Sequence, residues 1–86
     1  MSDLWPDTFE SLLRAYLPLL PTESPLAEDA SLAQLGLDSL GTVGMLVELE
    51  ETFEVTIPDE SLTPETFATP IVLWRTVDSL LTATGS

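Results

Sequence analysis

Apolar residues recur at helical spacing near the start of the chain. Between residues 7 and 17 they follow the three- and four-residue steps that place side chains on one face of a helix, at Phe9, Leu12, Leu13, Tyr16 and Leu17. Asp7 is a candidate N-cap for this helix with Glu10 as its capping-box partner, and an earlier start capped by Asp3 is the alternative. Pro18 cannot donate a backbone hydrogen bond, so the helix ends or kinks there.

A long connection follows, from residue 18 to residue 38. It contains several residues that break regular structure, namely Pro21, Thr22, Ser24 and Pro25. Loops of this length are uncommon in a small domain unless side chains anchor them. The candidate anchors are Leu26, Leu32, Leu35 and Leu37, and residues 31–34 are a candidate for a short helical turn.

Residues 39–53 are predicted to form a second helix, which has more apolar residues than one face can hold. One set, expected to face the core, comprises Met45, Leu46, Leu49 and Phe53. A second set, the apolar strip, comprises Leu40, Val43 and Val47. Two interpretations of the strip remain open. It is either a surface for a partner protein or a second buried face inside a small bundle.

The last third of the chain predicts an extended segment and two further helices. Val55 to Ile57 favour an extended backbone, and Pro58 stops any helix before it. Thr63 and Pro64 indicate the start of a short third helix that reaches about Phe67. A last helix is expected over about residues 70–82, with Leu73, Trp74, Val77, Leu80 and Leu81 facing inward. The chain is therefore predicted to be one all-α domain over residues 1–86, with a long first loop and a short third helix.

Charge and composition narrow the range of functions. Fifteen acidic residues against two basic ones, Arg14 and Arg75, give a formal net charge of −13. Such a chain is repelled by nucleic acids and by anionic membranes, so its natural partners are proteins with basic surfaces, unless the charge serves solubility alone. Cysteine and histidine are absent, which excludes disulfides and the common thiolate and imidazole metal sites, and no metal is expected. No signal peptide or membrane-spanning run is visible, so we expect a cytoplasmic monomer, and Met1 before a complete first helix favours a free-standing protein.

Ser39 lies at the predicted start of the second helix. Asp38 is a suitable N-cap, which would put Ser39 in the first turn, where unpaired backbone N–H groups favour an attached phosphate. A catalytic serine needs a base, and the chain has neither histidine nor lysine, so no catalytic residue is expected. By itself, a serine here is most often a first-turn residue without chemistry.

Two glycines follow Ser39 within the same helix. Gly41 and Gly44 each cost about 1 kcal/mol relative to alanine inside a helix. Bare backbone at these positions indicates close approach by another helix or by a visiting protein. Simple tolerance near a fraying helix end is the alternative.

Three segments together resemble the acyl carrier protein family. They are "LGLDSL" at residues 35–40, "ELEETF" at residues 48–53 and "VTIPDE" at residues 55–60. The order of the predicted helices is also similar to that family over nearly the whole chain. The resemblance implies an acyl-carrier-like four-helix bundle in which Ser39 carries 4'-phosphopantetheine, supplied from coenzyme A by a phosphopantetheinyl transferase. It also implies a non-catalytic carrier whose cargo is a thioester on the arm's thiol.

Departures from the family pattern suggest which branch this chain belongs to. Carriers of fatty-acid synthesis usually have acidic residues two and five places after the serine, where this chain has Gly41 and Gly44. Partners would then read the apolar strip, the two glycines, Glu48 and Glu51. We therefore expect a discrete carrier of specialised, polyketide-like biosynthesis, served by an acyltransferase, a ketosynthase or an adenylation-type loading enzyme. An aminoacyl or peptidyl carrier is one alternative, and an acidic docking module without a prosthetic group is another.

Overall fold

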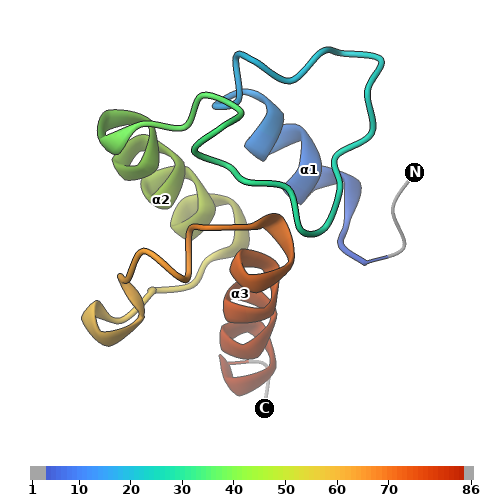
Figure 1. Ribbon diagram of the computed structural model, residues 1–86. Helices are drawn as coiled ribbons and strands as arrows, with labels where there is room; N and C mark the ends of the chain where they lie inside the picture. The colour runs from blue at the N-terminus through green and yellow to red at the C-terminus, as the bar shows by residue number, and fades with distance from the viewer. Residues whose placement is uncertain (1–3, 85–86) are drawn as a thin grey trace.

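Three α-helices and one short 3-10 helix form the regular structure of residues 4–84, the part of the chain that this computed structural model describes. They are α1 (Asp7–Arg14), α2 (Ser39–Phe53), η1 (Asp59–Ser61) and α3 (Pro70–Thr84), and no strand occurs among the described residues (Figure 1). The all-α prediction is confirmed. The expectation of four helices is not, because the structure has three α-helices, and the short third helix is replaced by turns.

The first helix begins where the sequence predicts but is capped differently. The carbonyl of Pro6, rather than the side chain of Asp7, accepts the first-turn N–H groups of Phe9 and Glu10. The capping box is therefore wrong, and the alternative cap, Asp3, lies outside the described residues. Regular α-helix stops at Arg14, and Tyr16 and Leu17 continue it as a tighter turn, with hydrogen bonds to the carbonyls three residues earlier.

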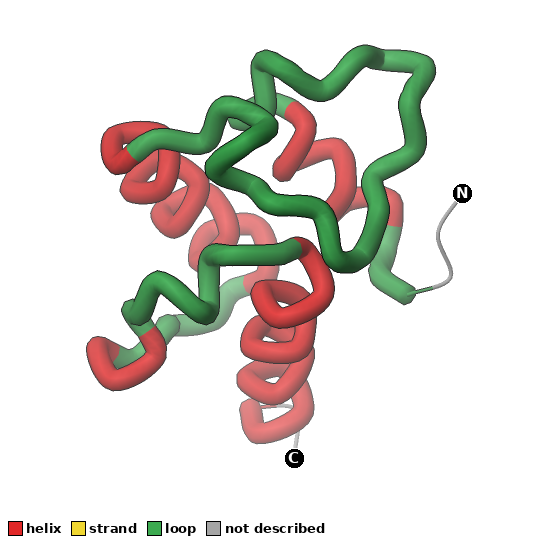
Figure 2. Tube along the Cα trace, viewed as in Figure 1, coloured by secondary structure: helices red, strands yellow, loops and turns green. Residues whose placement is uncertain are grey.

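The long loop is held by its leucines, as predicted. Leu26, Leu32 and Leu37 are buried and Leu35 is half-buried. The predicted helical turn is present, since the N–H of Leu35 donates to the Ser31 carbonyl. Backbone bonds from Leu32 to Ala68 and from Ile71 to Glu28 join the loop to the start of α3, and Figure 2 shows its path past both α1 and α3.

Helix α2 has the predicted bounds and ends at a left-handed residue. Glu54 has φ 55°, and its N–H and that of Val55 both donate to the Glu50 carbonyl. The Glu50 carboxylate then accepts the N–H of Ile57 at 2.8 Å. Val55 and Ile57 are buried in the extended segment, so the chain leaves α2 along the core, as the sequence predicts.

Residues 63–67, predicted as the third helix, form a turn. The N–H of Thr66 donates to the Thr63 carbonyl, and the N–H of Ala68 to that of Glu65. A helix starting at Thr63 has little room, because the residue before Pro70 is disfavoured from helical geometry. The short helix of this region, η1, lies earlier, directly after Pro58, and the sequence reading missed it.

Helix α3 starts at Pro70, as predicted, and completes the core. Its predicted inward residues are fully buried at Leu73 and Val77 and half-buried at Trp74, Leu80 and Leu81. The Thr69 hydroxyl makes no capping bond; it is buried without a hydrogen-bond partner. The core joins α1, α2 and α3 through fully buried side chains, namely Phe9, Leu13, Met45, Leu49, Leu73 and Val77. No helix of the described chain is long and apolar enough to cross a membrane.

Candidate functional site

Ser39 opens α2 at the protein surface. The Asp38 backbone is extended, and its carboxylate accepts the N–H of Gly41 at 2.7 Å, which confirms the predicted cap. Thr42 reinforces this turn, because its N–H and its hydroxyl both donate to the Asp38 carbonyl at 2.8 Å. Ser39 is exposed, and within the described chain its hydroxyl makes no hydrogen bond. A group attached there would lie beside the free amides at the positive end of α2.

Among the described residues, no side chain hydrogen-bonds to the Ser39 hydroxyl in a way that could activate it as a nucleophile. The chain contains no histidine, lysine or cysteine, and its only basic residues are Arg14 and Arg75. The adjacent carboxylate, Asp38, is engaged as the helix cap. The geometry therefore supports a serine that is modified by another protein rather than one that attacks a substrate.

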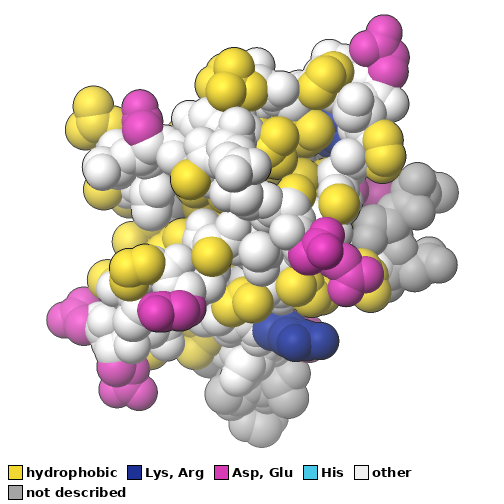
Figure 3. All heavy atoms as spheres, in the orientation of Figure 1, with side chains coloured by type: hydrophobic (Ala, Val, Ile, Leu, Met, Phe, Trp, Pro, Cys, Tyr) yellow, Lys and Arg dark blue, Asp and Glu magenta, His cyan; other side chains and the backbone are white. Residues whose placement is uncertain are grey.

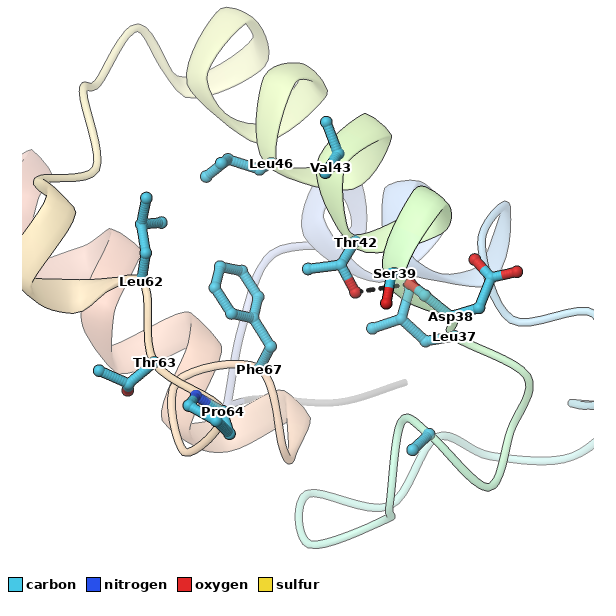
Figure 4. A pocket seen from close by; sticks show the side chains of 11 residues that line it. Leu37, Asp38, Ser39, Thr42, Val43, Leu46, Leu62, Thr63, Pro64 and Phe67 are labelled. Carbon is cyan, nitrogen blue, oxygen red and sulfur yellow. Dashed lines mark hydrogen bonds between the residues drawn. The ribbon is translucent and has the colours of Figure 1, made fainter.

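An apolar groove of about 640 Å³ opens next to Ser39 (Figure 4). One wall is the first half of α2, and the other is the segment between η1 and α3. The lining side chains that face each other across it are mainly apolar, namely Leu37, Val43, Leu46, Leu62, Pro64 and Phe67. The hydroxyls of Thr42 and Thr63 also line the groove, but both are hydrogen-bonded within the chain. The second wall was not predicted from the sequence. The apolar residues Leu62 and Phe67, at the two ends of the predicted short helix, were the signal that could have indicated it.

The two apolar sets on α2 separate as the periodicity predicts. Met45 and Leu49 are fully buried, and Leu46 and Phe53 are half-buried. The apolar strip is exposed instead: 85% of Leu40, 60% of Val43 and 46% of Val47 are accessible to solvent. The alternative that a bundle buries both sets is therefore wrong. Figure 3 shows apolar side chains distributed over one face of the molecule, with acidic side chains mostly near its outline.

The close approach that the glycines indicate comes from this chain itself. A Cβ atom at Gly44 would lie 3.1 Å from Cε1 and 3.3 Å from the hydroxyl oxygen of Tyr16. A Cβ atom at Gly41 would lie 3.1 Å from the capping oxygen of Asp38 and 3.3 Å from Leu37. Both contacts are tighter than ordinary van der Waals packing, so neither glycine needs a visiting protein to account for it.

The two predicted acidic contacts on α2 are both exposed, but they differ in their surroundings. Glu48 accepts a hydrogen bond from the Tyr16 hydroxyl at 2.6 Å. This bond to Glu48, with a smaller contribution from desolvation, raises the pKa of the Tyr16 phenol above its usual value of 10.0. Glu51, one turn from the strip's last valine, has no such contact in the described chain. The sequence predicts Tyr16 on the apolar face of the first helix, and its ring does pack against the core; its hydrogen bond to Glu48 was not predicted.

Comparison with known proteins decides the family. The model of the phosphopantetheine attachment site family matches residues 7–70, which span α1, the long loop, Ser39 and the groove. The chain belongs to the phosphopantetheine attachment site family. The prosthetic group of this family is covalently attached 4'-phosphopantetheine, which argues against an acidic docking module that lacks one.

Two individual proteins illustrate the relationship. The acyl carrier protein of Kineococcus radiotolerans is 44% identical over 43 residues, a match that spans half of this chain and 53% of that relative's length. A chain in the crystal structure of Bradyrhizobium japonicum glycine:[carrier protein] ligase complexed with glycylated carrier protein has a similar fold, with a TM-score of 0.63 and 26% sequence identity. That likeness covers 81% of this chain and 99% of the other.

Proposed function

We propose that Ser39 is the attachment residue for 4'-phosphopantetheine and that this carrier presents thioester-bound cargo to a series of enzymes. The observation that carries the proposal is the exposed, unpaired hydroxyl of Ser39 in the first turn of α2, directly after the Asp38 cap. A phosphodiester at this hydroxyl would lie at the positive end of the helix dipole. The arm would bring its own thiol, which explains how a chain without cysteine handles thioesters.

The protein's part in the chemistry is to hold and present. Ser39 anchors the arm, Asp38 keeps its helix turn in place, and the neighbouring apolar groove offers a surface on which an apolar part of the arm or cargo can rest. Catalysis belongs to the partners: a phosphopantetheinyl transferase, then an acyltransferase, a ketosynthase or an adenylation-type loading enzyme. We propose that the carrier is a cytoplasmic monomer.

The test is the intact mass of the chain after incubation with coenzyme A, magnesium and a promiscuous phosphopantetheinyl transferase. Wild type should gain one phosphopantetheinyl group, and Ser39→Ala should gain none while keeping its helical circular dichroism spectrum. Ser11→Ala, at an exposed serine on α1, is the matched control and should be modified like wild type. Modification of the Ser39→Ala chain would assign the site to another residue.

The cargo distinguishes two branches of the family. Glycines at positions 41 and 44, in place of the acids of fatty-acid carriers, favour an acyl carrier of polyketide-like biosynthesis. The structural neighbour, a chain from the crystal structure of a glycine:[carrier protein] ligase complexed with glycylated carrier protein, favours the alternative of an aminoacyl carrier. Offering the holo chain to an acyltransferase with acyl-coenzyme A, and separately to an adenylating ligase with ATP and amino acids, separates them by the mass of the thioester formed.

A further inference from the structure

Tyr16 reaches from the end of α1 across to α2. Its backbone is fixed, because its N–H donates to the Leu13 carbonyl at 2.9 Å and the next residue, Leu17, is 99% buried, with 1% of its surface exposed. From this anchored turn the aromatic ring extends over Gly44, and its hydroxyl meets the Glu48 carboxylate one helical turn further along α2. These contacts join residues that lie far apart in the sequence.

Gly44 is the residue that makes this crossing possible. Any side chain at position 44 would begin 3.1 Å from the tyrosine ring, so the ring would have to shift by a few tenths of an ångström. Glycine in the interior of a helix costs about 1 kcal/mol relative to alanine. The ring therefore packs over the position that, by the family resemblance, is usually acidic in carriers of fatty-acid synthesis.

The bond to Glu48 fixes a charge at the edge of the apolar strip. At about 100° per residue, Gly44 and Glu48 lie within roughly 80° of Leu40 around the axis of α2, on the side that faces α1. A hydroxyl–carboxylate bond of 2.6 Å is short and charge-assisted. It holds one carboxylate oxygen, Oε1, and within the described chain the other oxygen of Glu48 has no hydrogen bond.

We propose that Tyr16 is a positioning residue for partner recognition, which orients the Glu48 carboxylate so that its second oxygen receives a basic side chain of the docking enzyme. The proposal rests on the proposed carrier function. A net charge of −13 favours a partner surface with the opposite sign, and a charge held in one orientation loses less side-chain entropy on docking. Carriers with acids at both positions 41 and 44 attract a basic partner through several charges. In this chain Tyr16 would compensate in part, by holding the single Glu48 charge in a favourable orientation.

Steady-state modification of the full-length chain by the phosphopantetheinyl transferase tests this. Tyr16→Phe keeps the ring over Gly44 and removes the hydroxyl, so KM for the carrier should rise roughly threefold with kcat unchanged. Glu48→Gln, which removes the charge itself, should raise KM at least as much, and the double variant should be no worse than Glu48→Gln alone. Glu51→Gln, an exposed acid without a tyrosine contact, is the matched control, and its effect should multiply with that of Tyr16→Phe.

Two further measurements separate positioning from folding. Tyr16→Phe should keep the circular dichroism spectrum of wild type and lower the urea midpoint only slightly, as expected for the loss of one exposed hydrogen bond. The phenol pKa of Tyr16, followed by NMR, should fall in Glu48→Gln. An unchanged KM in Tyr16→Phe, or effects of Tyr16→Phe and Glu48→Gln that multiply, would overturn the proposal. Failure of the carrier function would look different, because wild type itself would then not be modified.

Discussion

Arg14 connects α1 to the long loop, and its removal should destabilise the fold measurably. Its Nη2 donates to the Ser24 carbonyl at 2.6 Å, and its Nε pairs with the Glu10 carboxylate at 3.0 Å. Two longer contacts, of 3.4 and 3.5 Å, reach the carbonyls of Pro21 and Thr22. One guanidinium group thus satisfies several backbone acceptors in a stretch of loop that contains no regular structure.

The size of the effect follows from these distances. A hydrogen bond from a charged donor contributes about 1.5–3 kcal/mol, and we take the lower end because the Arg14 side chain is 25% exposed. The ion pair with Glu10 is a helical i,i+4 pair near the surface and adds about 0.3–0.5 kcal/mol. The two long contacts add little. Arg14→Gln should therefore lower the free energy of unfolding by about 2 kcal/mol, which corresponds to roughly 8–16 °C in Tm for a domain of this size.

Urea unfolding followed by tryptophan fluorescence measures this change, since Trp5 and Trp74 both pack in the aromatic part of the core. Arg75→Gln is the matched control: it removes the same charge from an exposed site on α3 that makes no hydrogen bond or ion pair with the described residues. It should change stability by less than about 0.5 kcal/mol. Equal losses in the two variants would mean that only net charge matters and that Arg14 does not hold the loop.

Two further predictions concern acid sensitivity and partner contact. The hydrogen bond from Trp5, and then Arg14, holds the pKa of Glu10 below its usual 4.5. The stabilising contribution of the Glu10 carboxylate is therefore full above pH 4.5 and is lost as the pH falls through the lowered pKa. Urea titrations at a series of pH values should show the stability difference between wild type and Glu10→Gln vanish in that window. Val43→Asp should leave the fold intact, because 60% of Val43 is exposed. It should raise KM for partner enzymes about tenfold, because it places an unpaired charge in an apolar contact. An unchanged KM would show that partner enzymes do not contact the apolar strip.

The parts of the fold that were predictable are those fixed by neighbouring residues. The bounds of α2, the Asp38 cap and the division of the α2 side chains into buried and exposed sets all depend on spacings of three and four residues. The start of α3 follows from the fixed backbone angle of Pro70. Ser39 and its position relative to the cap were accessible for the same reason, whereas its attachment to a prosthetic group came from the resemblance to a family.

The parts that were missed depend on contacts between distant or weakly patterned residues. Glu10 has the right spacing for a capping box, but the Trp5 indole and Arg14 compete for its carboxylate, and the helix uses the Pro6 carbonyl instead. The stretch between α2 and α3 contains several helix-start signals in succession, and their order of preference depends on packing rather than on local sequence. The second wall of the groove was therefore not predictable residue by residue.

The glycines of α2 correctly predict a close contact, but they do not identify the residue that makes it. The sequence indicates that something comes close to position 44, but Tyr16 lies 28 residues earlier, and no local pattern connects the two. The energetic cost of glycine helps to explain why this contact exists. Glycine costs about 1 kcal/mol in the helix relative to alanine, and the hydrogen bond of Tyr16 to Glu48 is exposed to solvent, which weakens its contribution to stability. Stability alone therefore does not account for glycine at position 44, and the proposed orientation of the Glu48 carboxylate beside the apolar strip gives this arrangement a functional reason.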